Sequence, residues 1–343
     1  MLKKYLLRRI MMTSIQQNDD IKDEIRKNNP HTRFPSKLNI RKNGNTVIIE
    51  LYEAEIKNEN MQVPQNSFEG WAVAVRSCSN GYKVVLDVNG LGNYSKSDYL
   101  KKGHLSRFLY RAQKFKEQYG WFELSTNLKA EVNKFKEYLD SNVFVNNFPQ
   151  KEADNTERID DENAFEEELS KPDILREVLG NTGIVGDCVY RQLPVGLFEE
   201  KKVDEKAVFT HRKSAIDLWT IKGDTITIIE LKTKNRMIGI ITEIFFYSNY
   251  IYDFLKFNNF EFNHDFSKIK TVENLRGYDK LYENKEILKC VRGIMLADDN
   301  NFHPCVKNRE ITLKILNDSA NPNIKYDMAS YSYNIAITPS KQK

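Results

Sequence analysis

SAIDLWTIKGDTITIIELK, residues 214–232, contains two apolar runs of strand length on either side of a Lys-Gly-Asp turn at residues 222–224. Glycine and aspartate at such a position favour a tight hairpin, so we expect paired strands over 214–221 and 225–232. Three charged residues interrupt these apolar runs: Asp217, Glu230 and Lys232. A charge inside a buried strand is costly unless it is paired or binds a metal, and these three therefore need an explanation.

The spacing of these residues favours a common site. Side chains alternate along a strand, so Glu230 and Lys232, two residues apart, share one face. The tight turn pairs their strand with the preceding one, which can bring Asp217 beside Glu230. Two carboxylates with an adjacent ammonium group can hold Mg²⁺ and a water that attacks phosphate. A buried ion pair with a further charge at the strand end is the alternative interpretation.

The elements around the hairpin have a recognisable order in the C-terminal half. A helical segment and a strand precede it, and a long apolar helix and a fourth strand follow. The expected ranges are 162–179, 188–198, 237–256 and 288–297. The polar and aromatic stretch at 257–286 is typical of an insertion or a lid.

This combination resembles the PD-(D/E)XK nuclease superfamily, whose core is an αβββαβ unit with a D…(D/E)-x-K signature. Asp217 and the triplet Glu230-Leu231-Lys232 match that signature, with Ile216 in place of the usual Pro. The resemblance implies that Asp217 and Glu230 hold Mg²⁺, or Mn²⁺ as a substitute, helped by the Leu231 carbonyl. It also implies that Lys232 orients the attacking water.

Two further motifs of the superfamily have partial counterparts here, and the resemblance covers about residues 160–300. Glu243 and Tyr247 match a Q-x-x-x-Y motif on the following helix, with Glu in place of Gln, and would lie beside the metal ligands or the substrate. The alternative is that Glu243 is a carboxylate at the edge of the core, bonded to a neighbour, and that Tyr247 packs in the core. On the first helix, Glu162 is the candidate for an additional metal ligand, with Glu166 as its substitute. A first-turn glutamate favoured by the helix dipole is the competing interpretation.

The N-terminal half has a different pattern, with strands expected first and helices afterwards. Residues 46–52 (TVIIELY) form a strand candidate. Two more candidates, 71–77 and 82–88, flank Asn80-Gly81, a dipeptide that suits a tight hairpin. This order predicts an α+β domain.

Two amphipathic helices are expected after these strands, over residues 105–115 and 128–139. On the first, Arg107, Arg111 and Lys114 fall opposite the apolar face. A basic stripe of this kind could bind the phosphate backbone of a nucleic acid. An ordinary solvated helix face is the alternative.

The chain is long enough for two domains. Its 343 residues, 40% of them hydrophobic, can supply two cores. An acidic connector before residue 168 suggests a boundary near residue 155. We therefore expect a flexible segment over 1–30, an α+β recognition or partner domain over 31–150, and a nuclease-like α/β domain over 155–343.

Net charge, cysteine spacing and the longest apolar stretch limit the possible partners and the expected cellular compartment. A net charge of +4 neither demands nor excludes a nucleic acid. The cysteines form no C-x-x-C pair, which argues against a zinc site or a disulfide framework and indicates reduced, buried thiols in a cytoplasmic protein. The longest apolar stretch, 237–254, contains Glu243, Asn249 and Asp253, so we expect no membrane span. The four cysteines are Cys78, Cys188, Cys290 and Cys305.

These observations predict a cytoplasmic, Mg²⁺-dependent endonuclease or other phosphodiesterase acting on DNA. Restriction or phage defence is a suitable setting by analogy. A non-catalytic module that binds nucleic acid or protein on a nuclease fold is the main alternative, and an RNA-directed nuclease of the same fold is another. A protein partner at the N-terminal domain and a homodimer are both left open.

Overall fold

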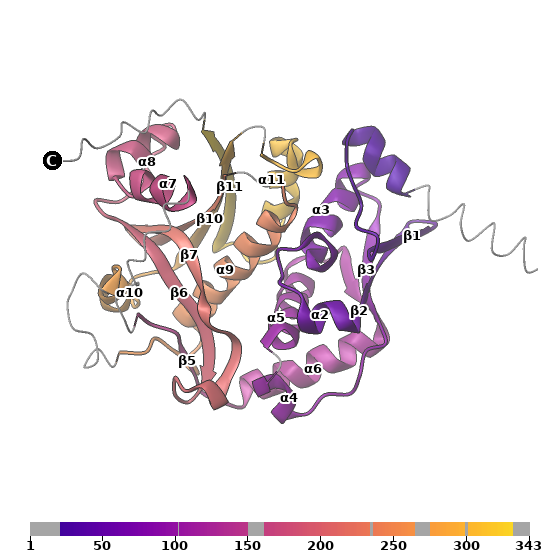
Figure 1. Ribbon diagram of the computed structural model, residues 1–343, viewed down its shortest axis with the longest axis horizontal. Coiled ribbons are helices and arrows are strands. Elements are labelled where there is room, and N and C mark those ends of the chain that lie inside the picture. Colours follow the sequence, from indigo (N-terminus) through magenta and orange to yellow (C-terminus); the bar gives the residue numbers. More distant parts are fainter. Residues whose placement is uncertain are drawn as a thin grey trace, which may run out of the picture.

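The computed structural model describes residues 21–101, 103–149, 161–233, 236–264, 275–298 and 301–331. Over these ranges the chain is a mixed α/β protein with two mixed β-sheets, one from the N-terminal half and one mainly from the C-terminal half. Figure 1 shows the two sheets on opposite sides of the molecule, with helices α3, α5 and α9 between them. The interior between the sheets is where the candidate site lies.

The smaller sheet has the strand order β1-β2-β3-β4. β1 pairs antiparallel with β2, and β2, β3 and β4 run parallel to one another. The strands are β1 (Asn39–Asn43), β2 (Thr46–Tyr52), β3 (Lys83–Asn89) and β4 (Phe122–Leu124). The helices of this half are α2 (Glu53–Asn58), α3 (Phe68–Cys78), α4 (Lys96–Lys101), α5 (Gly103–Gln118) and α6 (Thr126–Asp140).

β2 has the bounds expected from the sequence, and α5 and α6 contain the two expected amphipathic helices. The prediction of a hairpin around Asn80-Gly81 is wrong, because residues 71–77 lie in helix α3, which connects the parallel strands β2 and β3. Residues 68–75 are all buried, so this helix has no polar face from which a helical period could be read. Strands and helices therefore alternate in this half, and the expected α+β arrangement is replaced by a mixed α/β one.

The larger sheet has the strand order β11-β10-β8-β7-β6-β5-β9. β6, β7 and β8 are antiparallel neighbours, whereas β8, β10 and β11 are parallel. Its strands are β5 (Phe144–Asn146), β6 (Val189–Glu199), β7 (Ala207–Lys222), β8 (Thr225–Lys232), β9 (Phe260–Glu261), β10 (Cys290–Asp298) and β11 (Ile324–Tyr331). The helices are α7 (Asp161–Leu169), α8 (Pro172–Val178), α9 (Gly239–Lys256), α10 (Tyr278–Asn284) and α11 (Arg309–Asn317).

The expected three strands, long helix and further strand occur in the expected order, and β8 has the expected bounds. The expected first helix is two helices, α7 and α8, and β9 and α10 come between α9 and β10. β7 is longer than expected, since it begins at Ala207 instead of residue 214. Helix α11 and strand β11 were not expected. Part of the 257–286 stretch forms β9 and α10, while 265–274 lie outside the described residues.

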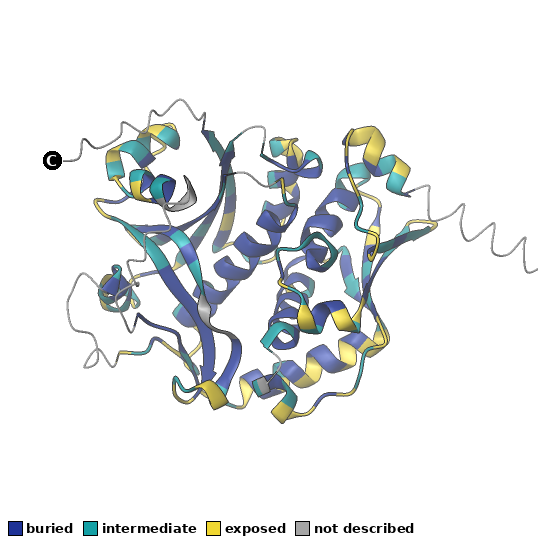
Figure 2. Ribbon diagram, viewed as in Figure 1, coloured by how far each residue is buried: buried dark blue, intermediate teal, exposed yellow. Residues whose placement is uncertain are grey.

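The apolar interior is continuous across the two sheets, with one cluster of buried side chains drawn from both halves. Figure 2 shows helices α3 and α9 almost wholly buried. β5 precedes the acidic connector yet belongs to the larger sheet. Residues 21–28 are helical with Ile21 and Ile25 buried, so this part of the expected flexible segment is packed. The division of the chain near residue 155 stays a prediction.

Two findings concern membrane-spanning helices and the cysteines. Within the described ranges, no helix combines the length and the apolar character that a membrane crossing requires. All four cysteines are free thiols. Cys305 is buried but Cys188 is exposed, contrary to the expectation that every thiol is buried.

Candidate active site

The β7–β8 hairpin brings Asp217 next to Glu230. Leu218 pairs with Ile229 in this antiparallel register, and Asp217 and Glu230 are the next residues outward on the two strands. The Leu231 amide donates a hydrogen bond of 2.8 Å to Asp217 Oδ2, which orients the carboxylate. The neighbouring carboxylates expected from strand alternation are therefore present.

Lys232 joins two carboxylates from different elements. Its Nζ donates to Glu230 Oε1 at 2.7 Å and lies 2.9 Å from Glu243 Oε2. Glu230 and Lys232 thus share one face of β8, as expected, and Glu243 reaches them from α9. Glu230 is only 4% exposed, and its Oε2 has no hydrogen-bond partner within the described part of the chain. A buried carboxylate oxygen without a partner is costly, which makes it a candidate ligand atom.

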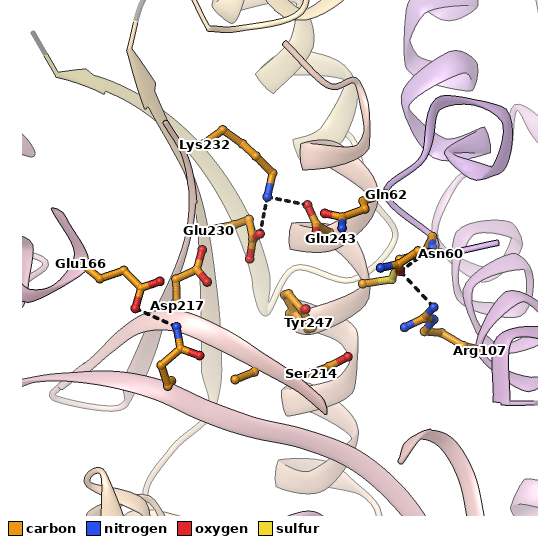
Figure 3. Close-up of a pocket in the computed structure, with 13 residues that line it drawn as sticks. Asn60, Gln62, Arg107, Glu166, Ser214, Asp217, Glu230, Lys232, Glu243 and Tyr247 are labelled. Carbon is orange, nitrogen blue, oxygen red and sulfur yellow. Dashed lines mark hydrogen bonds and ion pairs between the residues drawn. The ribbon is translucent and has the colours of Figure 1, made fainter. Parts of the chain in front are cut away.

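These side chains line a cavity of about 290 Å³ between the two halves of the chain. Figure 3 shows Asp217 and Glu166 toward one end of it, Arg107 and Asn60 toward the other, and Glu230, Glu243 and Lys232 between them. The lining consists of Asn60, Met61, Gln62, Arg107, Glu166, Gln192, Ser214, Ala215, Asp217, Glu230, Lys232, Glu243 and Tyr247. Most of its polar side chains are carboxylates, amides or cations, and such a lining suits a charged ligand.

The first helix supplies Glu166 to this cavity. Glu166 is buried and its Oε2 accepts a hydrogen bond of 2.7 Å from Gln192 Nε2. The side chain of Glu162, the expected additional ligand, lies outside the described residues. Glu166, its substitute, is the glutamate of α7 that the structure describes at the cavity.

Gln192 holds an unusual backbone conformation at the same place. It falls between the pairs Arg191–Leu218 and Leu193–Ile216, opposite Asp217 on the adjacent strand. Its φ is 55°, which is uncommon for a residue other than glycine. Strained residues of this kind concentrate at functional sites, and this one turns an amide toward Glu166. The sequence prediction missed Gln192, although pairing the expected strands 188–198 and 214–221 would have placed it beside Asp217.

Two carboxylates of the cavity, Asp217 and Glu230, resist ionisation. Burial, opposed by Lys232 and helped by Glu166, raises the pKa of Asp217 to about 7. Burial and the charges of Asp217 and Glu243 raise the pKa of Glu230 well above its ordinary value. Burial disfavours the charge of Lys232, but Glu230 and Glu243 outweigh it and hold its pKa well above the usual range. The cavity therefore has an excess of carboxylate that either protons or a cation must neutralise.

No family model, curated protein or solved structure matches this chain. The chemistry of the cavity is therefore the basis for inferring a function. Within the described ranges, no group of three or more His, Cys, Asp and Glu side chains has the arrangement of a metal site. Mg²⁺, however, is usually held by one or two carboxylates, with water and phosphate oxygens completing its shell.

The residues present fit a cation of that kind. Asp217 uses Oδ2 for the Leu231 amide and Glu230 uses Oε1 for Lys232, so each carboxylate keeps a second oxygen for a ligand. The oxygen that Glu230 keeps is the buried, unpartnered Oε2. Tyr247 lines the cavity as expected from its position on α9, and burial raises its pKa well above the ordinary value, so it stays a neutral phenol.

The basic stripe expected on α5 is not a solvent-facing surface. Arg107, Arg111 and Lys114 are all buried. Arg111 is paired with Glu69 at 2.6 Å and Lys114 with Asp253 at 2.8 Å, so neither is available to a nucleic acid. The polar face of α5 packs against α9 and the larger sheet, a contact that helical periodicity cannot reveal. Arg107 alone of the three lines the cavity.

Asn60 and Gln62 are cavity residues that sequence analysis missed entirely. They follow α2 in the N-terminal half and meet the C-terminal elements only through tertiary packing. Gln62 lies against the first turn of α9, where a Cβ on Gly239 would be 2.2 Å from the Gln62 carbonyl oxygen. No local pattern links residues 60–62 to the D…E-x-K signature, so the sequence offered no signal for them.

Proposed function

We propose that this chain is a Mg²⁺-dependent nuclease that hydrolyses phosphodiester bonds of DNA, with Asp217, Glu230 and Lys232 as its catalytic residues. The observation that carries this proposal is the buried Glu230 Oε2, which has no partner within the described residues although it lies beside Asp217 and a lysine. Two carboxylates and an ammonium group in a polar cavity are the side chains that metal-assisted phosphodiester hydrolysis requires.

The arrangement of elements supports the same proposal. α7 and α8 are followed by β6, β7 and β8, then by α9 and, after the short elements β9 and α10, by β10. This is the αβββαβ order implied by the resemblance to the PD-(D/E)XK superfamily, and Asp217 and Glu230-Leu231-Lys232 lie on adjacent strands within it. We infer a restriction-endonuclease-like core on that basis.

Asp217 and Glu230 would hold the metal, with the Leu231 carbonyl as a further oxygen ligand. A bound Mg²⁺ would supply a Lewis acid that stabilises negative charge on the phosphate and lowers the pKa of a bound water. Both carboxylates would then be ionised, since a bound cation offsets the burial and the carboxylate repulsion that raise their pKa values. The Leu231 amide keeps Asp217 oriented during this change.

Lys232 would act as a fixed cation and not as a base. Glu230 and Glu243 keep its pKa high, so it is protonated at neutral pH. A protonated amine can donate to the attacking water and to a phosphate oxygen, where negative charge grows as the water oxygen bonds to phosphorus and the bond to the leaving sugar oxygen breaks. Glu243 would hold Lys232 at that place by its 2.9 Å ion pair.

The test measures metal binding and cleavage in the same proteins. Plasmid, linear and single-stranded DNA and RNA are incubated with Mg²⁺, Mn²⁺ or EDTA, and Mn²⁺ binding is measured by titration calorimetry. We expect cleavage of DNA only with a metal, and a loss of about 10²-fold or more in Asp217→Asn and Glu230→Gln. Asp224→Asn, at the exposed turn of the same hairpin, is the matched control and should behave as wild type.

Each other outcome has a defined meaning. A folded wild-type protein that binds Mn²⁺ but cuts no substrate supports the non-catalytic binding module. Cleavage of RNA alone supports the RNA-directed alternative. A protein that neither binds a divalent ion nor cuts any substrate contradicts the proposal.

A further inference from the structure

Arg107 reaches the candidate active site from the N-terminal half of the chain. It is 5% exposed, lies on α5 and lines the cavity that holds Asp217 and Glu230. Its Nη2 donates to Asn60 Oδ1 at 3.1 Å and lies 2.9 Å from His104 Nδ1. Neither contact is to a carboxylate, and in the part of the chain that the structure describes no carboxylate lies within ion-pair distance of Arg107.

Arg111, one helical turn further along, shows what a structural arginine looks like in this protein. Its Nε and Nη2 bind both oxygens of Glu69 at 2.7 and 2.6 Å, and Nη2 also donates to the Asn66 carbonyl at 2.8 Å. The charge of the Arg111 guanidinium is neutralised, and its Nε and Nη2 donors are already hydrogen-bonded. Arg107 lies on the same helix, and among the described residues only the more distant charge of Glu243 favours its protonated form, with no carboxylate in ion-pair contact. Its burial is therefore costly unless an anion binds it.

Arg107 keeps its charge despite this burial. Burial and the neighbouring Arg111 lower its pKa to about 10, which leaves the guanidinium protonated at neutral pH. Its partner Asn60 belongs to the segment that packs tightly on Gly239 of α9. The cation is therefore held at a set position across the cavity from Asp217, as Figure 3 shows.

Resting on the nuclease function proposed above, we propose that Arg107 binds a phosphate of a single DNA strand, so that the N-terminal half completes the active site. A polynucleotide has a phosphate next to the one being cut, and a guanidinium fork matches phosphate oxygens in a bidentate manner. The scissile phosphate would lie at Asp217 and Glu230 and a neighbouring phosphate at Arg107.

The volume of the cavity favours single-stranded over double-stranded DNA. At about 290 Å³ it is just below the roughly 300–1,000 Å³ typical of small-ligand pockets. Such a volume admits about one nucleotide unit of a flexible strand. A duplex is much wider than this cavity and cannot bring one phosphodiester to its floor without opening. The substrate class that fits is a single strand or a frayed end.

The experiment separates anion binding from catalysis. Binding of a short fluorescein-labelled oligo(dT) strand, and of the same strand annealed to its complement, is measured by anisotropy in EDTA at several salt concentrations. Arg107→Gln should weaken single-strand binding by about 10- to 100-fold and reduce the salt slope by about 0.7, the share of one phosphate contact. Arg107→Lys should keep the slope but lose part of the affinity, because it keeps the charge without the fork. Lys129→Gln removes the same charge from an exposed site on α6 and should change neither quantity.

The outcomes distinguish this inference from the nuclease proposal. Single-strand binding that depends on Arg107, in a protein that cuts nothing, keeps the inference and overturns the nuclease. Metal-dependent cleavage that Arg107→Gln and Arg107→Lys leave unchanged, with melting temperatures like wild type, overturns the inference and keeps the nuclease. A duplex bound as tightly as the single strand, or no single-strand binding by wild type, also overturns the inference.

Discussion

Lys232 is the counter-charge of two buried glutamates, and its removal has consequences for folding as well as for turnover. In metal-free protein, Lys232→Ala leaves Glu230 and Glu243 without their cation. We expect a loss of about 3–5 kcal/mol in unfolding free energy in EDTA, since breaking a buried pair strands the remaining charge.

The measurement is urea denaturation of Lys232→Ala with EDTA and with Mg²⁺, beside turnover. Mg²⁺ should restore part of the lost stability, whereas turnover should stay about 10²-fold down. Lys222→Ala, exposed at the end of β7, is the control. Unchanged stability in EDTA would mean that the ion pairs contribute little.

Asp217 gives the metal-free protein a pH dependence of known sign. Its folded pKa of about 7 is above the ordinary 3.8, so the folded state holds the proton longer and loses stability as pH rises from about 4 through 7. Asp217→Asn removes this penalty and keeps an oxygen that can accept from the Leu231 amide. We expect the variant to be more stable than wild type in EDTA at pH 8, by roughly 1–4 kcal/mol, and similar to it near pH 4.

Denaturation curves of both proteins in EDTA across this pH range test the prediction. A variant that is less stable than wild type at pH 8 would show that the ionised Asp217 carboxylate does not destabilise the metal-free folded protein. Mg²⁺ should stabilise wild type more at pH 8 than at pH 6, because protons compete with the metal for Asp217.

At the scale of elements, the first turn of α9 holds the segment 60–62 against the cavity. A Cβ at Gly239 would be 2.2 Å from the Gln62 carbonyl oxygen, and a backbone atom cannot move aside cheaply. Gly239→Ala should therefore cost about 1–3 kcal/mol by overpacking. It should also weaken single-strand binding, because the displaced segment includes Asn60, the partner of Arg107.

Gly120 is a suitable control for this steric prediction. A Cβ there would meet no atom within 4 Å, so Gly120→Ala should stay within about 0.5 kcal/mol of wild type. Thermal melts of the two variants make the comparison. Equal melting temperatures would mean that the segment 60–62 adjusts freely.

At the scale of the whole molecule, the two halves share a buried polar network as well as an apolar core. Lys114 and Tyr110 of α5 both bind Asp253 of α9, and Glu69 of α3 joins Arg111 to Thr242. Separating the halves would expose all of these groups. We expect one cooperative unfolding transition for the full chain, and unfolded or aggregated products when residues 1–150 and 155–343 are expressed separately.

Denaturation followed by both circular dichroism and tryptophan fluorescence checks this, since Trp71 and Trp219 are in different halves. Two separate transitions, or a half that folds alone, would contradict it. The same outcome would support the domain boundary expected near residue 155.

The sequence by itself determined the elements that have a clear helical period or an apolar run of distinctive length. The helices α5 and α6 follow from helical spacing, whereas strand 225–232 and helix α9 follow from the lengths of their apolar runs. The neighbouring positions of Asp217, Glu230 and Lys232 also follow, because a tight hairpin ties residues close in sequence to a common face.

Only the tertiary structure decided which surfaces meet. α3 is buried on every side, so its composition could not distinguish a helix from a strand. Arg107, Arg111 and Lys114 have the same spacing and charge, yet two of them neutralise buried carboxylates and one enters the cavity. The physical reason is that a local sequence pattern reflects only interactions within one helical turn or one hairpin. The solvation and the partner of a side chain depend on segments far away in the sequence, which are brought together only when the apolar core closes.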